Sequence, residues 1–247
     1  MTIRITWART GATLLALAIA GFLVAWSGVI NIGASSGHWK ITDVVLHWSM
    51  RKSVRTHAAL GSPEDAAARG GLVSAAGHFA QSCAGCHGAP GMLPLPVMHA
   101  ATPHAPDLQK NAGKWSDRQL FWILEHGVKF SGMPYWAARD RPDEIGRMVS
   151  FVRALPTMTP EQYRALTQGA DQPVAGLMPG AVAKCTGCHG ADGRGRGQAD
   201  VPVLAGQKPE VLAAALRAYQ LNGRSSALMR QAAAQLRPEE IVALSRH

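Results

Sequence analysis

The longest apolar stretch of the chain lies near its N-terminus, where residues 11–32 contain no charged side chain. About 20 apolar residues suffice for a helix to cross the hydrocarbon core of a bilayer, whereas the apolar part of a cleaved signal peptide is only about 7–15 residues long. We therefore expect residues 1–36 to carry an uncleaved transmembrane anchor. Cleavage near Ala34 and Ser35, where small residues follow the apolar stretch, is the alternative.

A second segment, residues 37–61, mixes apolar and basic side chains, and from residue 42 to residue 60 it contains no glycine or proline. This pattern predicts a helix, and two environments fit it. In one, Trp48 lies at the level of the lipid headgroups while basic residues such as Arg51 and Arg55 meet phosphates. In the other, the helix packs on the domain that follows it.

Beyond residue 61, capping residues and prolines mark further helices. Ser62-Pro63 with Asp65 predicts a helix start that leads toward residue 83, and Ser116 and Thr159 each stand three residues before a glutamine, as in a capping box. Proline and glycine supply the other boundaries: Pro142 and Pro209 open helices, and Gly127, Pro156 and Gly223 end them. No segment has a convincing strand pattern, so the predicted fold class is all-α.

The formal net charge of the chain is +9, and the excess of basic residues is concentrated near the N-terminus. Residues 1–63 carry six Lys or Arg side chains against Asp43 alone. An anionic membrane surface attracts such a segment. We find no basic patch interleaved with aromatic side chains, the pattern typical of nucleic-acid binding, and we therefore expect a membrane partner and no nucleic acid.

All four cysteines of the chain lie in two copies of one pentapeptide, Cys-x-x-Cys-His. This is the signature of c-type haem attachment, because two thiols three residues apart can bond the two vinyl groups of one porphyrin while the adjacent imidazole binds its iron. A zinc site and a thioredoxin-like redox pair are the alternative interpretations. Two copies that use every cysteine favour haem. We therefore predict two covalently bound haem c groups, attached through Cys83, Cys86, Cys185 and Cys188, with His87 and His189 as iron ligands.

The two motifs begin an internal repeat. They lie 102 residues apart, and four landmarks further along the chain, among them Pro106 with Pro202 and Met133 with Met229, lie 96 residues apart. This register indicates duplication, and the six extra residues of the first copy fall in the loop after its haem motif. We expect a juxtamembrane segment over residues 37–61, a first domain over residues 62–166, a linker over residues 167–180 and a second domain over residues 181–247.

Each iron needs a ligand opposite its histidine, and the repeat offers Met133 and Met229 at equivalent positions. Each methionine follows a helix-ending glycine by six residues, so we expect both on loops that fold back over the porphyrin. A thioether ligand raises the redox potential and suits electron transfer. The competing histidines are His99, His104 and His126 in the first domain, which have no repeat counterparts, and the terminal His247 in the second.

Two prolines at equivalent repeat positions, Pro106 and Pro202, are candidates for supporting the proximal histidines. A backbone carbonyl near each can accept a hydrogen bond from the imidazole Nδ1 and fix the orientation of the ring. The alternative is that these prolines only mark turns. Tyr135 and Trp136, close to Met133, shield a haem edge or serve as ordinary packing.

The second domain departs from the first in two places. Ala181 stands where the first domain has Phe79. The last helix of the second domain ends at residue 247, whereas the equivalent helix of the first domain is several residues longer and continues to Leu155. We expect the second domain to lack aromatic cover where its first and last helices cross. Its haem is then either more exposed than the first or buried against the first domain.

These residues resemble class I cytochrome c domains, and the pair resembles a membrane-anchored dihaem cytochrome c. The second domain, with CTGCHGADGRGRG, VPVLAGQ and ALMRQAAAQLRPEEI, looks like a cytochrome c4-type module. The first, with CAGCHGAPG, PDL and HGVKFSGMPYW, is similar to cytochrome modules of bacterial respiratory chains. The resemblance covers residues 64–247. It implies proximal roles for His87 and His189, distal roles for Met133 and Met229, and one-electron transfer rather than substrate turnover.

With protein ligands on both sides of each iron, no open site is left for peroxide or oxygen, so we expect an electron carrier rather than an enzyme. We expect a single-pass protein of the bacterial inner membrane with its N-terminus in the cytoplasm, because c-type haem is attached outside it, in the periplasm. The expected donor is a quinol-oxidising complex or dehydrogenase, and the acceptor a terminal oxidase or soluble cytochrome of a respiratory chain. A permanent subunit of a larger oxidase or dehydrogenase complex is one alternative, and a dihaem peroxidase, in which one iron has lost its methionine, is another.

Overall fold

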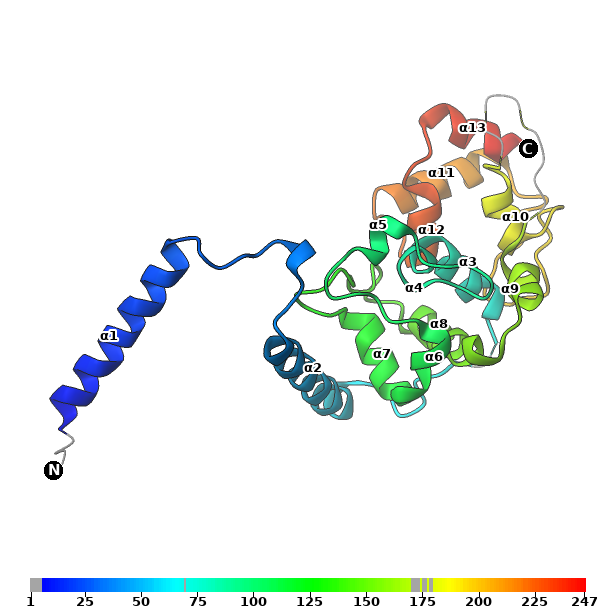
Figure 1. Cartoon of the computed structure of the whole chain (residues 1–247). Helices are drawn as coiled ribbons and strands as arrows, with labels where there is room; N and C mark the ends of the chain where they lie inside the picture. Colours follow the sequence, from blue (N-terminus) through cyan, green and yellow to red (C-terminus); the bar gives the residue numbers. More distant parts are fainter. Residues whose placement is uncertain (1–5, 69, 170–173, 175–176, 178–179) are drawn as a thin grey trace. The chain divides into compact units, whose positions relative to one another are not determined.

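The computed structural model of the chain describes residues 6–68, 70–169, 174, 177 and 180–247 (Figure 1). Most of the linker predicted over residues 167–180 therefore lies outside the described residues. The chain divides into two units, residues 1–39 and residues 40–247.

The first unit contains a long helix, α1 (Trp7–Trp26), and a short 3₁₀ helix, η1 (Ala34–Ser36). Thr6 caps α1, since its hydroxyl accepts from the amide of Arg9. The helix ends at Trp26, six residues before the apolar stretch does, because Ser27 caps it and Gly28 turns the backbone to a φ of 68°. In the described part of the chain, α1 alone is long and apolar enough to cross a membrane, a property that anchors and signal sequences share.

The second unit consists of α-helices and short 3₁₀ helices joined by loops. Its helices are α2 (Lys40–Gly61), α3 (Leu72–Ser82), α4 (Ala84–His87), α5 (Pro96–His99), α6 (Leu108–Asn111), η2 (Ala112–Lys114), α7 (Asp117–His126), α8 (Pro142–Ala154), η3 (Leu155–Thr157), α9 (Pro160–Thr167), α10 (Ala183–His189), α11 (Pro209–Gln220), α12 (Ala227–Ala233) and α13 (Pro238–Arg246). No strand forms among the residues that the structure describes, which confirms the all-α fold class. We call α3–α9 domain one and α10–α13 domain two.

The predicted helix boundaries are confirmed where capping boxes mark them and wrong at one serine. Ser116 and Thr159 form the capping boxes of α7 and α9. Ser62, in contrast, does not open a helix: its amide donates to Ala58 at the end of α2, and its carbonyl accepts from Arg118. The helix that leads to the first haem motif begins ten residues later, at Leu72.

Aromatic side chains form the core of domain one where α3 crosses α8 and α9. Phe79 of α3 and Phe151 of α8 are both fully buried, with ring centroids 5.2 Å apart. Tyr163 of α9 meets Phe79 edge-on at 6.5 Å. Such aromatic pairs contribute about 0.5–1.5 kcal/mol beyond their buried area. This core fixes the end of α3 from which the first Cys-x-x-Cys-His motif follows.

Helix α2 packs along α7 through its C-terminal half. Val54 and Ala58 are 1% exposed, and His57 stacks on Trp122 of α7 with ring centroids 5.7 Å apart. The guanidinium of Arg118 donates to the carbonyl of Ser62, just past the end of α2, at 2.9 Å. The C-terminal half of α2 therefore packs on the domain that follows it, which is one of the two environments expected from its sequence.

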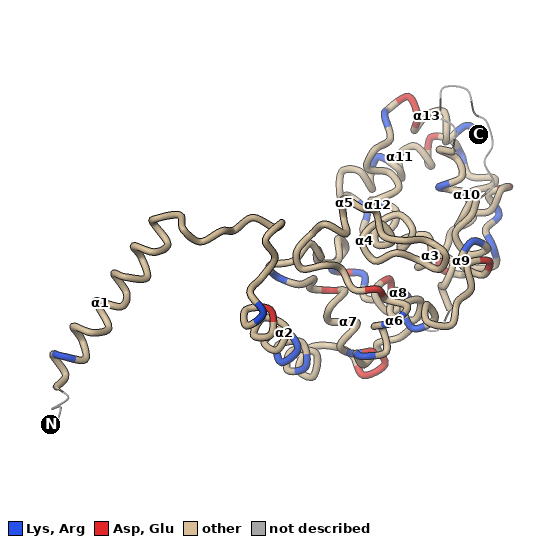
Figure 2. Tube along the Cα trace, in the orientation of Figure 1, with Lys and Arg blue, Asp and Glu red and all other residues tan. Residues whose placement is uncertain are grey.

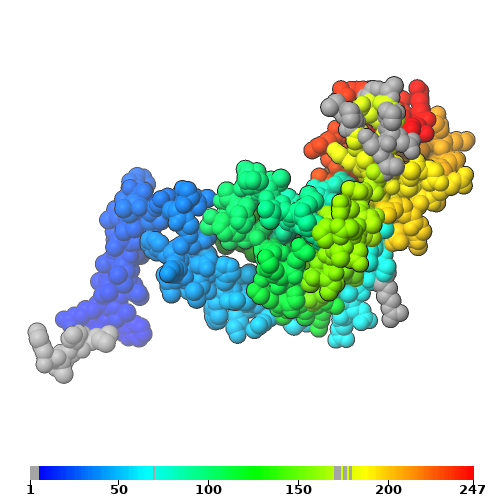
Figure 3. Space-filling model, turned by 45° about the vertical axis from the view of Figure 1, so that its right-hand side comes forward, coloured from blue at the N-terminus to red at the C-terminus, as the bar shows by residue number. Residues whose placement is uncertain are grey.

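Domain two lacks the aromatic helix crossing of domain one, as its sequence predicts. Its last helix, α13, has 9 residues against 13 in the equivalent α8. Two of its helices instead pack on domain one, since α10 and α12 both contact α3. Ala227 of α12 lies in the same buried cluster as Phe79. In Figure 3 the yellow-to-red residues of domain two lie against the green and cyan residues of domain one. We expected the second haem to be either more exposed than the first or buried against domain one. The contacts of α10 and α12 with α3 favour burial against domain one.

Charged side chains hold this domain interface together. One carboxylate oxygen of Glu144 accepts from the amide of Ala227, the first residue of α12, at 2.9 Å. The guanidinium of Arg141 donates to the carbonyl of Ser225 at 2.9 Å, and that of Arg230 donates to the carbonyl of Ala137 at 2.7 Å. The interface is therefore a defined set of hydrogen bonds between the domains.

We expect Glu144→Ala to lower the free energy of unfolding of the haem-loaded chain by about 2 kcal/mol, because a charged acceptor is removed from a buried helix N-terminus. The matched control is Glu239→Ala, whose side chain is 62% exposed and pairs with Arg237. This control should change the free energy by less than about 0.5 kcal/mol. Denaturant titrations followed by circular dichroism measure both, and equal losses would contradict the interface described above.

Candidate haem sites

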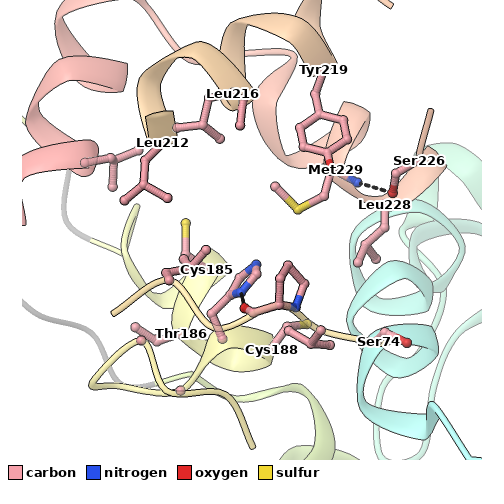
Figure 4. Close-up of a pocket in the computed structure, with 18 of the residues that line it drawn as sticks. Ser74, Cys185, Thr186, Cys188, Leu212, Leu216, Tyr219, Ser226, Leu228 and Met229 are labelled. Carbon is pink, nitrogen blue, oxygen red and sulfur yellow. Dashed lines mark hydrogen bonds between the residues drawn. The ribbon is translucent and has the colours of Figure 1, made fainter. Parts of the chain in front are cut away.

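A cavity of about 560 Å³ lies inside domain two and is bordered by domain one. Both cysteines of the second motif line it, together with His189 of α10 and Met229 of α12. Figure 4 shows Met229 pointing into the cavity, with Cys185 and Cys188 on the other side and Leu212 and Leu216 on a further wall. The cavity thus brings together two thiols, an imidazole, a thioether and apolar side chains, which is the set of groups that a covalently bound haem requires.

His189 is oriented by a backbone carbonyl. It ends α10, is 7% exposed, and its Nδ1 lies 2.9 Å from the carbonyl oxygen of Pro202. Burial lowers the pKa of His189, while the hydrogen bond to Pro202 opposes that shift. The imidazole is therefore neutral near pH 7. Because its Nδ1–H donates to the carbonyl, the lone pair on Nε2 is left for a metal.

Met229 lies in the first turn of α12 and not on a loop. Ser226 caps this helix and accepts from the amide of Met229 at 3.1 Å. The loop that we expected around Met229 is thus wrong, although its side chain still points into the cavity. A helical backbone holds the thioether more firmly than a loop, which suits a ligand that must keep its position in both oxidation states.

In the second motif, Cys188 is buried and Cys185 is half-buried. Burial raises the pKa of both Cys185 and Cys188. Among the described residues, no three His, Cys, Asp or Glu side chains gather in an arrangement that could hold a metal ion.

The first motif repeats the geometry of the second. Nδ1 of the half-buried His87 lies 2.8 Å from the carbonyl oxygen of Pro106, and burial lowers the pKa of His87. His87 precedes its proline by 19 residues and His189 precedes Pro202 by 13, so the loop of the first domain is six residues longer, as the repeat predicts. Burial and the neighbouring Cys86 raise the pKa of Cys83 to about 12.

Met133 lies on a loop, as expected, and the loop folds back on the end of α7. The carbonyl of Met133 accepts from the amide of Val128 at 3.1 Å, and its amide donates to the hydroxyl of Ser131 at 3.2 Å. Gly127 ends α7 with a φ of 65°, and a Cβ there would lie 2.6 Å from the Met133 carbonyl oxygen. Only glycine fits both requirements. The half-buried Met133 remains our predicted distal ligand in domain one.

The competing histidines of domain one lie at the surface. His99 and His104 are exposed and stack on each other, with ring centroids 5.0 Å apart. His126 stacks on Trp122 at 4.7 Å, and its Nδ1 lies 3.1 Å from the Trp122 carbonyl oxygen. These contacts give each of the three a partner other than haem.

Domain one contributes residues to the domain-two cavity that the sequence did not indicate to us. Ser74, Ala75 and His78 of α3 line this cavity, and so does Trp136, which is 7% exposed. The ring of Trp136 packs on His78 with centroids 4.7 Å apart. The sequence offered one signal for this contact. Positions 74, 75 and 78 of α3 carry polar or small side chains, opposite the apolar face of the same helix.

Comparison with known families agrees with this geometry. The family described as cytochrome C oxidase, cbb3-type, subunit III matches residues 72–152, from the start of α3 into α8. The family described as cytochrome c matches residues 181–244, from just before α10 into α13. No match was found among curated proteins or among solved structures. The chain therefore contains two tandem cytochrome c domains, each of which carries one Cys-x-x-Cys-His motif.

Proposed function

We propose that this chain is a membrane-anchored dihaem cytochrome c that carries single electrons in a respiratory chain. Cytochrome c domains imply haem c and electron transfer. The observation that carries the proposal is the arrangement of the domain-two cavity, in which His189 and Met229 border one space together with both cysteines of the motif. An iron held there would be bound by His189 and Met229, which would leave no position for a substrate.

The residues of each site have different roles in holding the cofactor. The cysteines attach the haem, which supplies a one-electron iron couple when bound. Pro106 and Pro202 fix the proximal imidazoles through their carbonyls and strengthen them as donors. In domain two, Leu212 and Leu216 form part of the apolar lining of the cavity. Apolar surroundings disfavour the more highly charged ferric state and, together with a thioether ligand, favour a high potential.

The N-terminal unit supports a location at the bacterial inner membrane. α1 has the length and composition of a membrane anchor. We propose that its N-terminus lies in the cytoplasm and the haem domains in the periplasm. In α2, Ile41, Val44 and Trp48 are exposed in the N-terminal half, and Figure 2 shows basic residues further along the helix. This half of α2 is suited to the lipid headgroup region.

The proposed partners are a quinol-oxidising complex or a dehydrogenase as electron donor, and a terminal oxidase or a soluble cytochrome as acceptor. A second candidate function, a permanent cytochrome subunit of an oxidase complex, is favoured by one observation. Domain one matches a family described as subunit III of an oxidase. The two candidates share the redox chemistry and differ in how long contact with the partner lasts.

Purification from native membranes in a mild detergent tests the proposed function. We expect the full chain to elute separately from any oxidase, to accept electrons one at a time, and to show low-spin haem that does not bind carbon monoxide. Co-elution with an oxidase at constant stoichiometry through two columns would establish the second candidate instead. A high-spin or carbon monoxide-binding iron in the isolated protein would contradict the carrier function.

A further inference from the structure

Helix α3 of domain one contributes side chains to both cytochrome domains. On one side, Ala76 and Phe79 are fully buried in the core of domain one. On the other side, Ser74, Ala75 and His78 line the cavity of domain two. Residues three and four positions apart on a helix are neighbours on its surface, so His78 adjoins both Ala75 and Ser74 along this wall of the cavity. Domain one therefore supplies part of the enclosure around the second haem site.

The second haem motif lies directly against this helix. The sulfur of Cys188 is 3.9 Å from the carbonyl oxygen of Val73, and Val73, Cys188 and Val201 form a small buried cluster. At Gly77, one turn further along α3, an added Cβ would lie 2.9 Å from the same sulfur. The absence of a side chain at Gly77 thus sets how closely α3 approaches an attachment cysteine of the other domain.

The same helix ends at the first haem motif. Cys83 caps α3 six residues after Gly77, which corresponds to about 9 Å along the helix axis. One short helix therefore joins the attachment point of one haem to the contact surface of the other. A change in α3 that leaves the core of domain one intact can act on the haem of domain two.

His78 is an unsatisfied polar group in this wall. Its Nδ1 is buried and has no hydrogen-bond partner among the described residues, and its ring packs on Trp136. Burial lowers the pKa of His78 to about 4, so the imidazole is neutral at pH 7. A buried polar atom without a partner is uncommon in a folded protein and calls for an explanation such as a ligand that the site receives.

Polar contacts fix the wall at the rim of the cavity. The hydroxyl of Ser74 donates to a carboxylate oxygen of Asp200 in domain two at 2.5 Å. The same oxygen of Asp200 lies 3.5 Å from Nε of Arg147 on α8. All three residues line the cavity. The contact between α3 and the second haem site therefore has a defined geometry, maintained from both domains.

We propose that domain one completes the haem site of domain two, with Gly77 setting the approach of the Cys188 thioether and His78 contacting the porphyrin. This inference rests on the proposed function, because it requires haem at both motifs. It makes the redox potential of the second haem depend on residues of the first domain. His78 and Gly77 are positioning residues, since neither is a ligand of the iron.

The first test is Gly77→Ala in the haem-loaded full chain, with Gly113→Ala as the matched control. Alanine is the better helix former, so α3 itself is not weakened, and the added methyl group acts through its contact with Cys188. A Cβ at Gly113 has no atom within 4 Å. We expect Gly77→Ala to lower the midpoint potential of the domain-two haem, because opening the contact admits water, which stabilises the ferric state. The control should leave both potentials unchanged.

The second test is His78→Phe, which keeps a ring against Trp136 and removes the unpartnered nitrogen. We expect this variant to raise the midpoint potential of the domain-two haem, because an apolar ring disfavours the charged ferric state. Redox titrations measure both variants. The component that Met229→His displaces identifies the domain-two haem, so the assignment does not depend on the variants under test.

Five outcomes decide between the possibilities. Opposite shifts of the domain-two component in the two variants support the inference, and a shift in either variant alone, confined to that component, also supports it. Two covalent haems whose potentials stay unchanged in both variants, or shifts confined to the domain-one component, would overturn the inference alone. A wild-type chain with a single covalent haem, seen by intact mass, would overturn the proposed function and the inference with it.

Discussion

Replacing Cys185 and Cys188 together by serine is expected to leave a chain with one covalent haem, held by Cys83 and Cys86. Serine is close to cysteine in size but forms no thioether with a vinyl group, so attachment fails at the altered motif only. The reciprocal variant, with serine at Cys83 and Cys86, is expected to keep the haem of domain two. Haem staining of denatured protein and intact mass measure both variants.

The two variants should nevertheless differ in stability. The apolar core of domain one includes three aromatic side chains, Phe79, Phe151 and Tyr163, that pack on one another. Domain two has Ala181 at the position of Phe79 and a cavity of about 560 Å³ at its centre. Loss of the second haem should therefore lower the unfolding midpoint of domain two, because an empty apolar cavity of that size forfeits packing. If either double-serine variant still carried two covalent haems, the assignment of one haem to each Cys-x-x-Cys-His motif would be contradicted.

Replacing Met133 or Met229 by histidine is expected to lower the midpoint potential of one haem by a few tenths of a volt, within the ~0.8 V that axial ligands span. The thioether is a soft ligand that favours ferrous iron, and imidazole is a stronger donor that favours ferric iron. Each variant should move one component of the redox titration and leave the other in place. The spectra should remain low-spin, because histidine still fills the sixth position.

The control for these variants is Met92→His, since Met92 is 58% exposed and has no counterpart in domain two. It should leave both potentials unchanged. Met133 is the more demanding test, because it lies on a loop, whereas Met229 is held in the first turn of α12. If Met133→His changed neither potential, another group would be the distal ligand in domain one. His99, His104 and His126 would then be substituted in turn.

Local chemistry explains why most of each haem site could be predicted from the sequence. Covalent attachment requires two cysteines and a histidine at fixed spacing, so the motif itself is the signal. Pro106 and Pro202 occupy equivalent positions of the repeat. The carbonyl oxygens of both prolines lie within 3 Å of the Nδ1 atoms of the two motif histidines. In both cases the relevant residues are related by spacing along the chain, which the sequence displays directly.

The features that we missed depend on contacts between distant segments. Ser62 looks like a helix cap, but its amide and carbonyl are used by α2 and Arg118. The spacing of Met229 after Gly223 predicts a loop, but Ser226 provides the N-cap of a helix there. The role of α3 as a wall of the second cavity follows from the packing of the two domains, and no periodicity within α3 reveals which partner covers its polar face.

The most direct test of the central claim is the intact mass of the purified full chain under denaturing conditions, measured together with its haem iron content. Non-covalent cofactors are lost in such a measurement, and thioether-bound haem is retained. The account predicts the mass of the polypeptide plus two haem groups, with two iron atoms per chain. A polypeptide mass without haem, or with one haem in the wild-type protein, would contradict it.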